Sequence, residues 1–391
     1  MGSAPQTSPA EGLGLYLHIP FCRSKCAYCH FSIDPGTPDA DRRQRYLEAL
    51  LAEIEATSAT LGRRPPADTV YFGGGTPSLL PPESIRRLIE ALGRHFQLDP
   101  QAEITLEANP GDLDSAGYLA LREAGVNRLS LGVQSFSDPV LREMGRGHSA
   151  AMGLAAVEMA RRAGFENLSV DLILGWPGET LARWRTSLDR VRSLAPEHVS
   201  LYLLEVSGKC LLAHRERHGG LLLPDEDTVA DLYHASLEAL AAGRLERYEI
   251  SNLERPGRRS RHNGKYWDDG SYLGFGMSAH SHWAGWRFWN LGRFGAYCRA
   301  IESRGGGASR AGERFPSARE RAAEALFLAL RRREGVDLAG FRDRYGLDVM
   351  GVYGGPLSDS FEAGLVEVRE GRLRLTERGV LLSNEVFQVF V

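Results

Sequence analysis

The strongest constraint on the fold is a regular alternation of short apolar runs with helical patterns. The runs recur about every 30 residues, a spacing typical of strand and helix pairs, at residues 15–19, 69–72, 103–108, 128–134, 168–174 and 199–206. Between them, apolar residues spaced three and four apart, as at 46–54, are typical of one helix face. The alternation predicts a parallel sheet with right-handed crossovers, in an open doubly wound sheet or a full or partial barrel.

Residues capable of chemistry gather where these runs end. They are the cysteines at 22–29, the Gly-Gly-Gly-Thr-Pro turn at 73–77, Glu107, Asn109, Gln134, and the segment 171–178 that begins with Asp171. In both architectures, ligands bind at the carboxyl ends of the strands. We therefore expect these residues to share one pocket.

The composition is that of a globular protein, with 43% hydrophobic and 25% charged residues in a chain of 391. Single cores rarely grow beyond about 300 residues, so we expect more than one domain. The net charge of -3 gives no reason to expect a nucleic-acid partner. The sequence shows neither a secretory signal nor the roughly 20 apolar residues that span a bilayer, so we expect a cytoplasmic protein.

Four segments follow from these patterns. We expect a disordered tail at 1–12, the barrel at 13–225, an extension rich in aromatic residues at 226–315, and a small winged-helix-like α+β domain at 316–391. The last assignment depends on an Ala- and Leu-rich helical pattern at 319–332 and an alternating strand pattern at 372–375.

Cys22, Cys26 and Cys29 follow the first run in the spacing C-x3-C-x2-C. One loop can therefore present three thiolates to a soft metal centre. A structural zinc site takes four ligands, and no second pair at zinc-finger spacing is present. A 4Fe-4S cluster held by three cysteines keeps one iron open. Cys210 and Cys298 are isolated, and we expect each to act as a small apolar residue.

The segment 16–31, which reads Y-x-H-I-P-F-C-x3-C-x-Y-C-x-F, resembles the radical S-adenosylmethionine (SAM) signature of the oxygen-independent coproporphyrinogen III oxidase-like family. The resemblance implies a partial (β/α)6 TIM-like barrel and a 4Fe-4S cluster on the three cysteines. It also implies that the cluster reduces SAM to methionine and a 5′-deoxyadenosyl radical that takes hydrogen from a substrate. Whether this chain turns SAM over, and thus whether it is an enzyme, stays open.

The same resemblance implies a set of SAM-contacting residues: Tyr16, Tyr28, Phe31, Gly73, Gly74, Gly75, Thr76, Glu107, Gln134, Arg146 and Asp171. Their chemistry suits the task, because carboxylates pair with an ammonium or accept from ribose hydroxyls and a guanidinium binds a carboxylate. The alternative for each polar member is a hydrogen-bonded structural role, and for Tyr16 a place in the core.

Two features bear on the branch of the family. Coproporphyrinogen dehydrogenases carry a fourth cysteine where this chain has Phe31, and 262–267 matches the H-N-x-x-Y-W motif of the haem chaperone branch, HemW. His262 would then ligate haem iron, with Tyr266 and Trp267 packing on the macrocycle and His280 and His282 as further candidate ligands. Alternatively, His262 fixes a loop while Tyr266 and Trp267 fill the interface with the C-terminal module.

The sequence thus predicts a haem chaperone that passes haem to acceptors such as respiratory cytochromes. The main alternative is a coproporphyrinogen III dehydrogenase. A radical methyltransferase or a haem-degrading enzyme is a less expected alternative. We expect a flavodoxin- or ferredoxin-like electron donor, transient membrane contact and a homodimer as further associations.

Overall fold

The computed structural model of the chain describes residues 12–206, 208 and 210–390. Apart from Gly12, the tail predicted over 1–12 lies outside these described residues.

The six predicted strands are present and lie side by side in chain order: β1 (Leu13–Ile19), β4 (Pro66–Gly74), β5 (Gln97–Ala108), β6 (Arg128–Gln134), β7 (Leu168–Leu174) and β8 (His198–Leu203). All five neighbouring pairs are parallel. A doubly wound sheet would reverse its order at one point, and this one does not. The prediction of a partial barrel is therefore confirmed.

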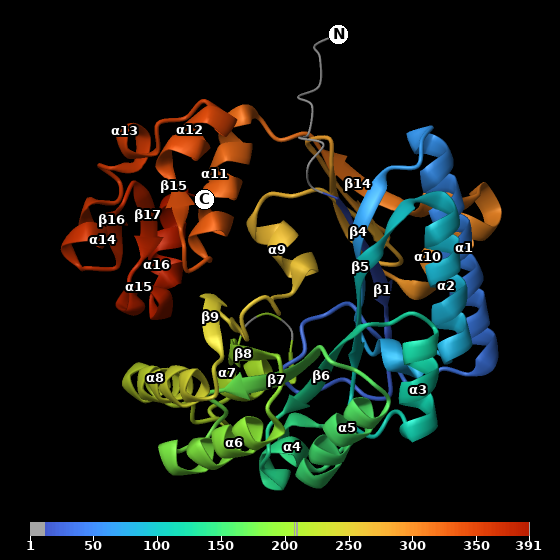
Figure 1. Ribbon diagram of the computed structural model, residues 1–391, viewed down its shortest axis with the longest axis horizontal. Coiled ribbons are helices and arrows are strands. Elements are labelled where there is room, and N and C mark those ends of the chain that lie inside the picture. The colour runs from blue at the N-terminus through green and yellow to red at the C-terminus, as the bar shows by residue number, and fades with distance from the viewer. Residues whose placement is uncertain (1–11, 207, 209, 391) are drawn as a thin grey trace.

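Helices connect the strands and cover the outer face of the sheet (Figure 1). They are α1 (Ala40–Leu61), α2 (Pro82–His95), α3 (Ser115–Glu123), α4 (Asp138–Met144), α5 (Ala150–Arg162) and α6 (Leu181–Leu194). In α1 the predicted apolar face is buried, including Tyr46, Leu50 and Ile54. The helix begins after Asp39, whose carboxylate accepts from Arg42 N at 2.7 Å, and ends at Gly62 in the left-handed region.

The predicted extension adds strands to both ends of the sheet, which the sequence patterns did not indicate. At one end β10 (Asn252–Glu254) pairs with β8 and with β9 (Glu246–Glu249). At the other, β11 (Tyr272–Phe275) lies parallel to β1, and β12 (His280–Trp283), β13 (Trp286–Asn290) and β14 (Arg310–Arg314) continue antiparallel. The described sheet has 12 strands. The division of the chain at 226–315 stays a proposal, and the strands of this segment belong to the barrel sheet.

Three further helices follow the barrel strands: α7 (Leu211–Arg217), which precedes the predicted extension, and α8 (Glu226–Ala242) and α10 (Phe294–Arg304), which lie within it. A fourth, α9 (Arg261–Trp267), packs inside the curve of the sheet and lies between the sheet and the C-terminal module (Figure 1). Its first two backbone N–H groups donate to the Glu103 carboxylate on β5, each at 3.1 Å. This helix therefore fills the end of the barrel away from the carboxyl ends of the strands.

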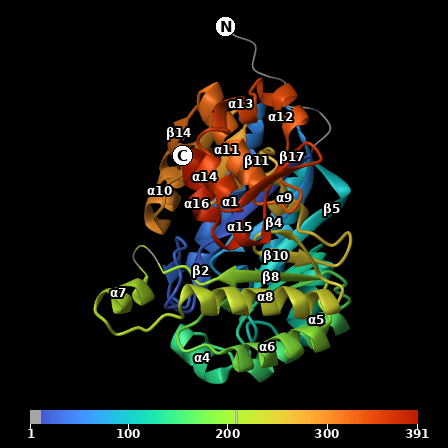
Figure 2. The ribbon, with the colours of Figure 1, turned by 90° about the vertical axis from the view of Figure 1, so that its left-hand side faces the viewer.

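The C-terminal module is α+β, as predicted (Figure 2). Its helices are α11 (Ala318–Leu330), α12 (Leu338–Tyr345), α13 (Val349–Tyr353), α14 (Ser358–Glu362), α15 (Glu377–Leu381) and α16 (Ser383–Phe387). Its antiparallel sheet has the order β15 (Val336–Asp337), β17 (Arg372–Leu375), β16 (Val366–Arg369). One hydrophobic core runs continuously from the barrel into this module.

Polar contacts also tie the module to the barrel. Arg247 pairs with Glu377 at 3.0 Å, Tyr345 OH donates to Asp269 at 3.0 Å, and Arg332 pairs with Asp268. None of the described helices is long and apolar enough to cross a membrane.

Candidate functional site

A pocket of about 450 Å³ opens at the carboxyl ends of the barrel strands. It collects most of the predicted site residues: Cys22, Cys26, Tyr28, Cys29, Phe31, Gly74, Gly75, Thr76, Glu107, Gln134, Arg146 and Asp171. Tyr16 and Gly73 are not among the lining residues. The expectation that strand-end residues meet in one pocket is confirmed by this geometry.

The loop that carries the cysteines is held by backbone hydrogen bonds on both sides of Ala27. Ala27 N donates to Met144 O at 3.0 Å, and Leu212 N donates to Ala27 O at 2.9 Å. Ala27 and Met144 belong to a small apolar cluster that includes Trp176 and Cys210. Cys298 lies in the main core, as expected for an isolated cysteine. The cysteine loop thus has its own packed support, independent of any bound metal.

The three thiols are partly buried, and burial favours the neutral form of Cys22 and Cys29. Burial raises the pKa of Cys22 to about 11 and also raises the pKa of Cys29. Cys22 Sγ lies 3.5 Å from Thr76 Oγ1, while Arg146 Nη1 donates to Cys26 Sγ at 3.6 Å. Metal binding at Cys22 and Cys29 therefore displaces protons, and the Arg146 guanidinium offsets part of the negative charge of the cysteine sulfurs.

Among the described residues, no three His, Cys, Asp or Glu side chains are arranged to hold a single metal ion. The three thiols nevertheless line one pocket. In a 4Fe-4S cluster each cysteine binds a different iron, so the sulfurs need not converge on one point. The arrangement fits a cluster better than a lone ion.

The glycine turn after β4 lies directly against the end of β1 and the short strand β2 (Phe21–Cys22) that follows it. Gly75 N donates to Ile19 O at 2.8 Å, and Thr76 N donates to Phe21 O at 2.7 Å. A Cβ at Gly75 would lie 2.7 Å from Phe21 O, and one at Gly74, whose φ is +107°, would enter the His18 ring. Only glycine allows this approach, which brings backbone groups to the pocket wall.

Two buried carboxylates lie in the floor of the pocket. Glu107 accepts from Tyr71 OH at 2.8 Å and from Gly74 N at 3.2 Å, and burial together with the nearby Asp171 raises the pKa of Glu107 to about 7. Asp171 accepts from Ser130 Oγ at 2.9 Å, and burial raises its pKa. Near neutral pH Glu107 is only partly ionised, so a cationic ligand would increase its ionisation.

Gln134 and Arg146 have buried polar atoms without partners in the described part of the chain. These are Gln134 Oε1 and Arg146 Nε. Gln134 also has a φ of +65°, which is costly for a residue with a side chain. Arg146 Nη2 donates to Gly132 O at 2.6 Å and to Asn109. Unmet hydrogen-bonding capacity and backbone strain at one pocket are typical of a ligand site.

Tyr16 lies one layer deeper, where its hydroxyl is 3.1 Å from His18 Nδ1 and its ring stacks on Tyr71 with centroids 6.2 Å apart. Tyr16 therefore occupies a core position, which is the alternative to SAM contact that the sequence left open for it. Gly73 is equally a packing position, because a Cβ there would lie 2.9 Å from the Tyr71 ring.

Several lining residues escaped the sequence reasoning: Arg23, Asp112, Ser130 and Tyr202. Arg23 pairs with Asp112 at 3.4 Å, and Asp112 also accepts from Ser78 Oγ at 2.9 Å. Ser130 and Tyr202 occupy inward-facing positions on β6 and β8. The alternation of strand residues predicts this direction once the strand bounds are known.

The H-N-x-x-Y-W motif forms α9 and lies apart from this pocket. His262 is 0 % exposed, with Nδ1 2.9 Å from Thr69 Oγ1 and Nε2 3.0 Å from Tyr266 OH. Burial and the charge of Lys265 lower the pKa of His262 to about 3. The Arg331 guanidinium covers the Trp267 ring at 4.5 Å. This arrangement is the interface alternative, and a role for His262 as haem ligand stays a prediction.

The two other histidine candidates also lie outside the pocket. His282 is buried, with Nδ1 3.1 Å from Gly270 O, and His280 stacks on Trp289 with centroids 6.0 Å apart. His282 lies in the same aromatic cluster as His262, because its ring centroid is 6.2 Å from that of Tyr272, which packs on Tyr266 beside His262.

Comparison with known proteins places the chain. Sequence models of the radical SAM superfamily and of the HemN C-terminal domain match residues 16–191 and 317–382. Two curated proteins named haem chaperone HemW are similar over nearly the whole length. The one from Lactococcus lactis is 35% identical over 96% of each chain. The one from Bacillus subtilis is 37% identical over 96% of this chain and 98% of its own. The chain belongs to the HemW family of radical SAM proteins.

Membership of the HemW family confirms the resemblance seen in the cysteine signature. A solved structure of coproporphyrinogen III oxidase (HemN) from Escherichia coli, described as a radical SAM enzyme, is similar with a TM-score of 0.85 and 25% identity, over 98% of this chain and 91% of that one. The pocket of this HemW family member contains thiols, a glycine turn and polar atoms without hydrogen-bond partners among the described residues. These features fit the iron–sulfur cluster and SAM of the superfamily.

Proposed function

We propose that this chain is a haem chaperone, which binds haem and passes it to acceptor proteins such as respiratory cytochromes. The observation that carries the proposal is the similarity, over nearly the full length, to proteins named haem chaperone HemW. The sequence argument from Phe31 and the H-N-x-x-Y-W motif supports the same branch.

Cys22, Cys26 and Cys29 would hold the cluster. When bound and reduced, a cluster of this kind supplies an electron to SAM at its open iron. The chain's own residues would position the cofactor: Arg146 balances charge at Cys26, while Glu107 and Asp171 present carboxylates to a cationic ligand. The raised pKa of Glu107 means that binding of a cation would release a proton from the floor near neutral pH.

Phe31 distinguishes the proposed function from coproporphyrinogen dehydrogenation. Its side chain is 67% exposed and lines the pocket where the dehydrogenases of the family carry a fourth cysteine. A phenyl ring can neither ligate iron nor donate a proton or hydrogen atom as a thiol does. The pocket therefore lacks a thiol at this exposed position.

One anaerobic experiment separates the two functions. The cluster-loaded protein is titrated with haem under Soret detection, incubated with an apo-cytochrome, and in parallel supplied with SAM, dithionite and coproporphyrinogen III. We expect saturable haem binding, transfer to the apo-cytochrome and no protoporphyrinogen. Formation of methionine and protoporphyrinogen in proportion, without saturable haem binding, would establish the dehydrogenase instead.

Other associations remain predictions from the sequence. They are a cytoplasmic location, a flavodoxin- or ferredoxin-like electron donor, transient membrane contact and a homodimer.

A further inference from the structure

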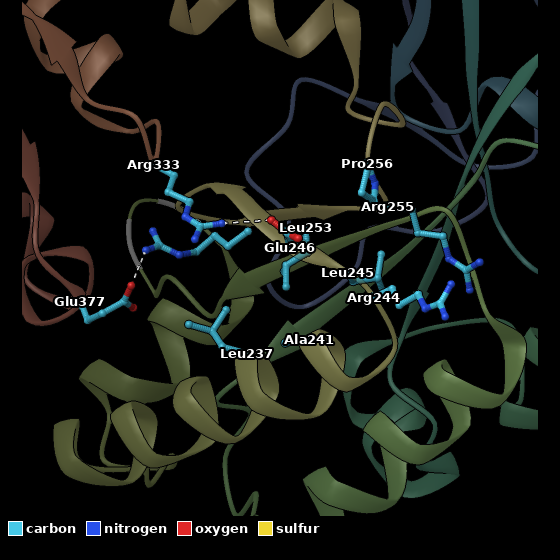
Figure 3. Close-up of a pocket in the computed structure, with 11 residues that line it drawn as sticks. Leu237, Ala241, Arg244, Leu245, Glu246, Leu253, Arg255, Pro256, Arg333 and Glu377 are labelled. Atoms are coloured by element: carbon cyan, nitrogen blue, oxygen red, sulfur yellow. Dashed lines mark hydrogen bonds and ion pairs between the residues drawn. The ribbon is translucent and has the colours of Figure 1, made fainter. Parts of the chain in front are cut away.

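A second large groove lies where the barrel meets the C-terminal module (Figure 3). Its volume is about 790 Å³, and it shares no lining residue with the cysteine pocket. Its floor is apolar and comes from the end of α8, from β10 and from the segments next to them: Leu237 and Pro256 reach the surface, while Leu245 and Leu253 are buried beneath. The groove therefore combines an apolar lining with a volume large enough for a sizeable ligand.

Charged side chains lie at both ends of the groove. At the end near the module, Arg247 pairs with Glu377 at 3.0 Å and Arg333 pairs with Glu246 at 3.3 Å. At the other end, the side chains of Arg244 and Arg255 extend to the same side of the view in Figure 3. In the described part of the chain neither has an ion-pair partner. Two cations that line the same groove, neither of them paired with a carboxylate, favour an anionic ligand.

Arg244 is held in a conformation that few residues with a side chain adopt. It follows the end of α8 with a φ of +63°, and Leu245 N donates back to Leu240 O at 3.0 Å, which closes the helix end. Glycine is the usual residue at this position. An arginine here retains backbone strain that the fold does not require, which indicates a use for the guanidinium.

Arg255 gives an independent indication. Its backbone N–H donates to Glu197 O at 2.8 Å, which fixes the start of the side chain, while its buried Nε lacks a partner among the described residues. A buried donor without an acceptor is costly, and a ligand oxygen at the groove would satisfy it.

We propose that this groove holds a porphyrin, with a ring face on the apolar floor and the propionate carboxylates on Arg244 and Arg255. The inference rests on the proposed haem-chaperone function and names a place for the cargo. Haem combines a flat apolar ring with two carboxylates on one edge, and this is the pattern that the groove complements. A groove at the surface, away from the cysteine pocket, also leaves the cargo accessible to an acceptor.

Recognition of this kind does not require iron. None of the residues lining the groove is a histidine, cysteine, methionine or tyrosine. The site therefore distinguishes porphyrins by their carboxylates, and iron-free protoporphyrin IX is expected to compete with haemin for it.

The decisive variant is Arg244→Gly, because glycine suits the backbone at this position and the protein should fold as well as the wild type. Binding of haemin and of protoporphyrin IX to the cluster-loaded full-length protein is measured by absorbance and by fluorescence. We expect Kd for both ligands to rise about tenfold, the change that corresponds to one lost charge-assisted contact.

Two further variants accompany this one. Arg255→Lys, which keeps the charge but removes the forked guanidinium, should weaken binding less. Arg258→Ala, an exposed arginine of the same loop that does not line the groove, is the matched control and should bind as the wild type does.

A chemical control removes the carboxylates in place of the arginine. Haemin dimethyl ester should bind wild type and Arg244→Gly with the same Kd, because neither complex contains the propionate–arginine contact. If Arg244→Gly binds haemin as tightly as the wild type, or loses affinity equally for haemin and its ester, the groove is not the porphyrin site. Wild-type protein that binds no haemin at all would instead overturn the proposed function itself.

Discussion

The two ends of the barrel interior differ in whether their buried polar side chains have hydrogen-bond partners. At the carboxyl ends of the strands, Gln134 and Arg146 have buried polar atoms without partners, and Gln134 carries backbone strain. At the opposite end, His262 on α9 is fully buried and both of its ring nitrogens have partners. Polar groups without partners are ones that a ligand can complete, whereas partnered groups such as the His262 ring nitrogens make a structural contact. The contrast applies to His262 and not to all of α9, because Trp267 Nε1 also lacks a partner among the described residues. A sequence motif alone does not separate these cases.

The largest expected effect concerns the cysteine end of the barrel. In Cys26→Ala we expect loss of nearly all cluster iron after anaerobic reconstitution, because two thiolates from one loop cannot hold a cluster that normally has at least three. Iron content and the visible absorption band measure this. Cys298→Ala, a substitution in the core, should retain the cluster, and a cluster that persists in Cys26→Ala would mean that another residue supplies the third ligand.

At the opposite end, His262→Ala should lower the free energy of unfolding by about 2–4 kcal/mol, since it opens a cavity and leaves the Thr69 and Tyr266 hydroxyls without their partner. Chemical denaturation measures the loss. Tyr266→Phe removes only one hydroxyl and should cost about 1 kcal/mol. Unchanged stability of His262→Ala together with an altered Soret band would reverse the comparison and make His262 the haem ligand that the motif predicts.

Ionisation of Glu107 links the pocket to pH. Its pKa is raised to about 7, so the carboxylate is mainly neutral below that pH and mainly charged above it. SAM is cationic, so its affinity should increase with pH, by up to about tenfold per unit below pH 7, and level off above it. Calorimetry on the cluster-loaded protein at several pH values gives the slope. Glu107→Gln should flatten this slope, and an equally steep slope in the variant would assign it to another group.

The smallest effect on stability is expected at Gln134. Gln134→Gly should change the free energy of unfolding by less than about 1 kcal/mol, because relief of the positive φ offsets the added freedom of the unfolded chain. Its affinity for SAM should nevertheless fall several-fold, as measured by the same calorimetry. Gln134→Asn, which tolerates the left-handed region and keeps an amide, is the control and should retain more affinity. A variant that loses stability but not affinity would place Gln134 with the structural residues.

Much of the barrel was predictable because buried parallel strands are continuous apolar runs. The run at 128–134 coincides with β6, and the run at 168–174 coincides with β7. The helical pattern at 319–332 and the strand at 372–375 likewise correspond to α11 and β17. Local periodicity is sufficient in each case, because it reports which face an element buries.

Long-range placement was not predictable in the same way. Nothing local to Tyr272 indicates that β11 pairs with β1, and nothing local to His262 shows that Thr69 lies beside it. The pocket was found because its residues follow strand ends. Ser130 and Tyr202 were missed because their chemistry is common and their inward direction depends on the strand register.

The position of β11 has a consequence for biosynthesis. β1 leads into the cysteine loop, and its outer neighbour, β11, begins only at Tyr272. During translation, β1 can pair with β4 early but keeps an unpaired edge until most of the chain has left the ribosome, and such edges recruit other strands. The nascent chain therefore depends on prompt arrival of its later segment. Products truncated before residue 272 should aggregate, even though every cysteine of the metal site has been made.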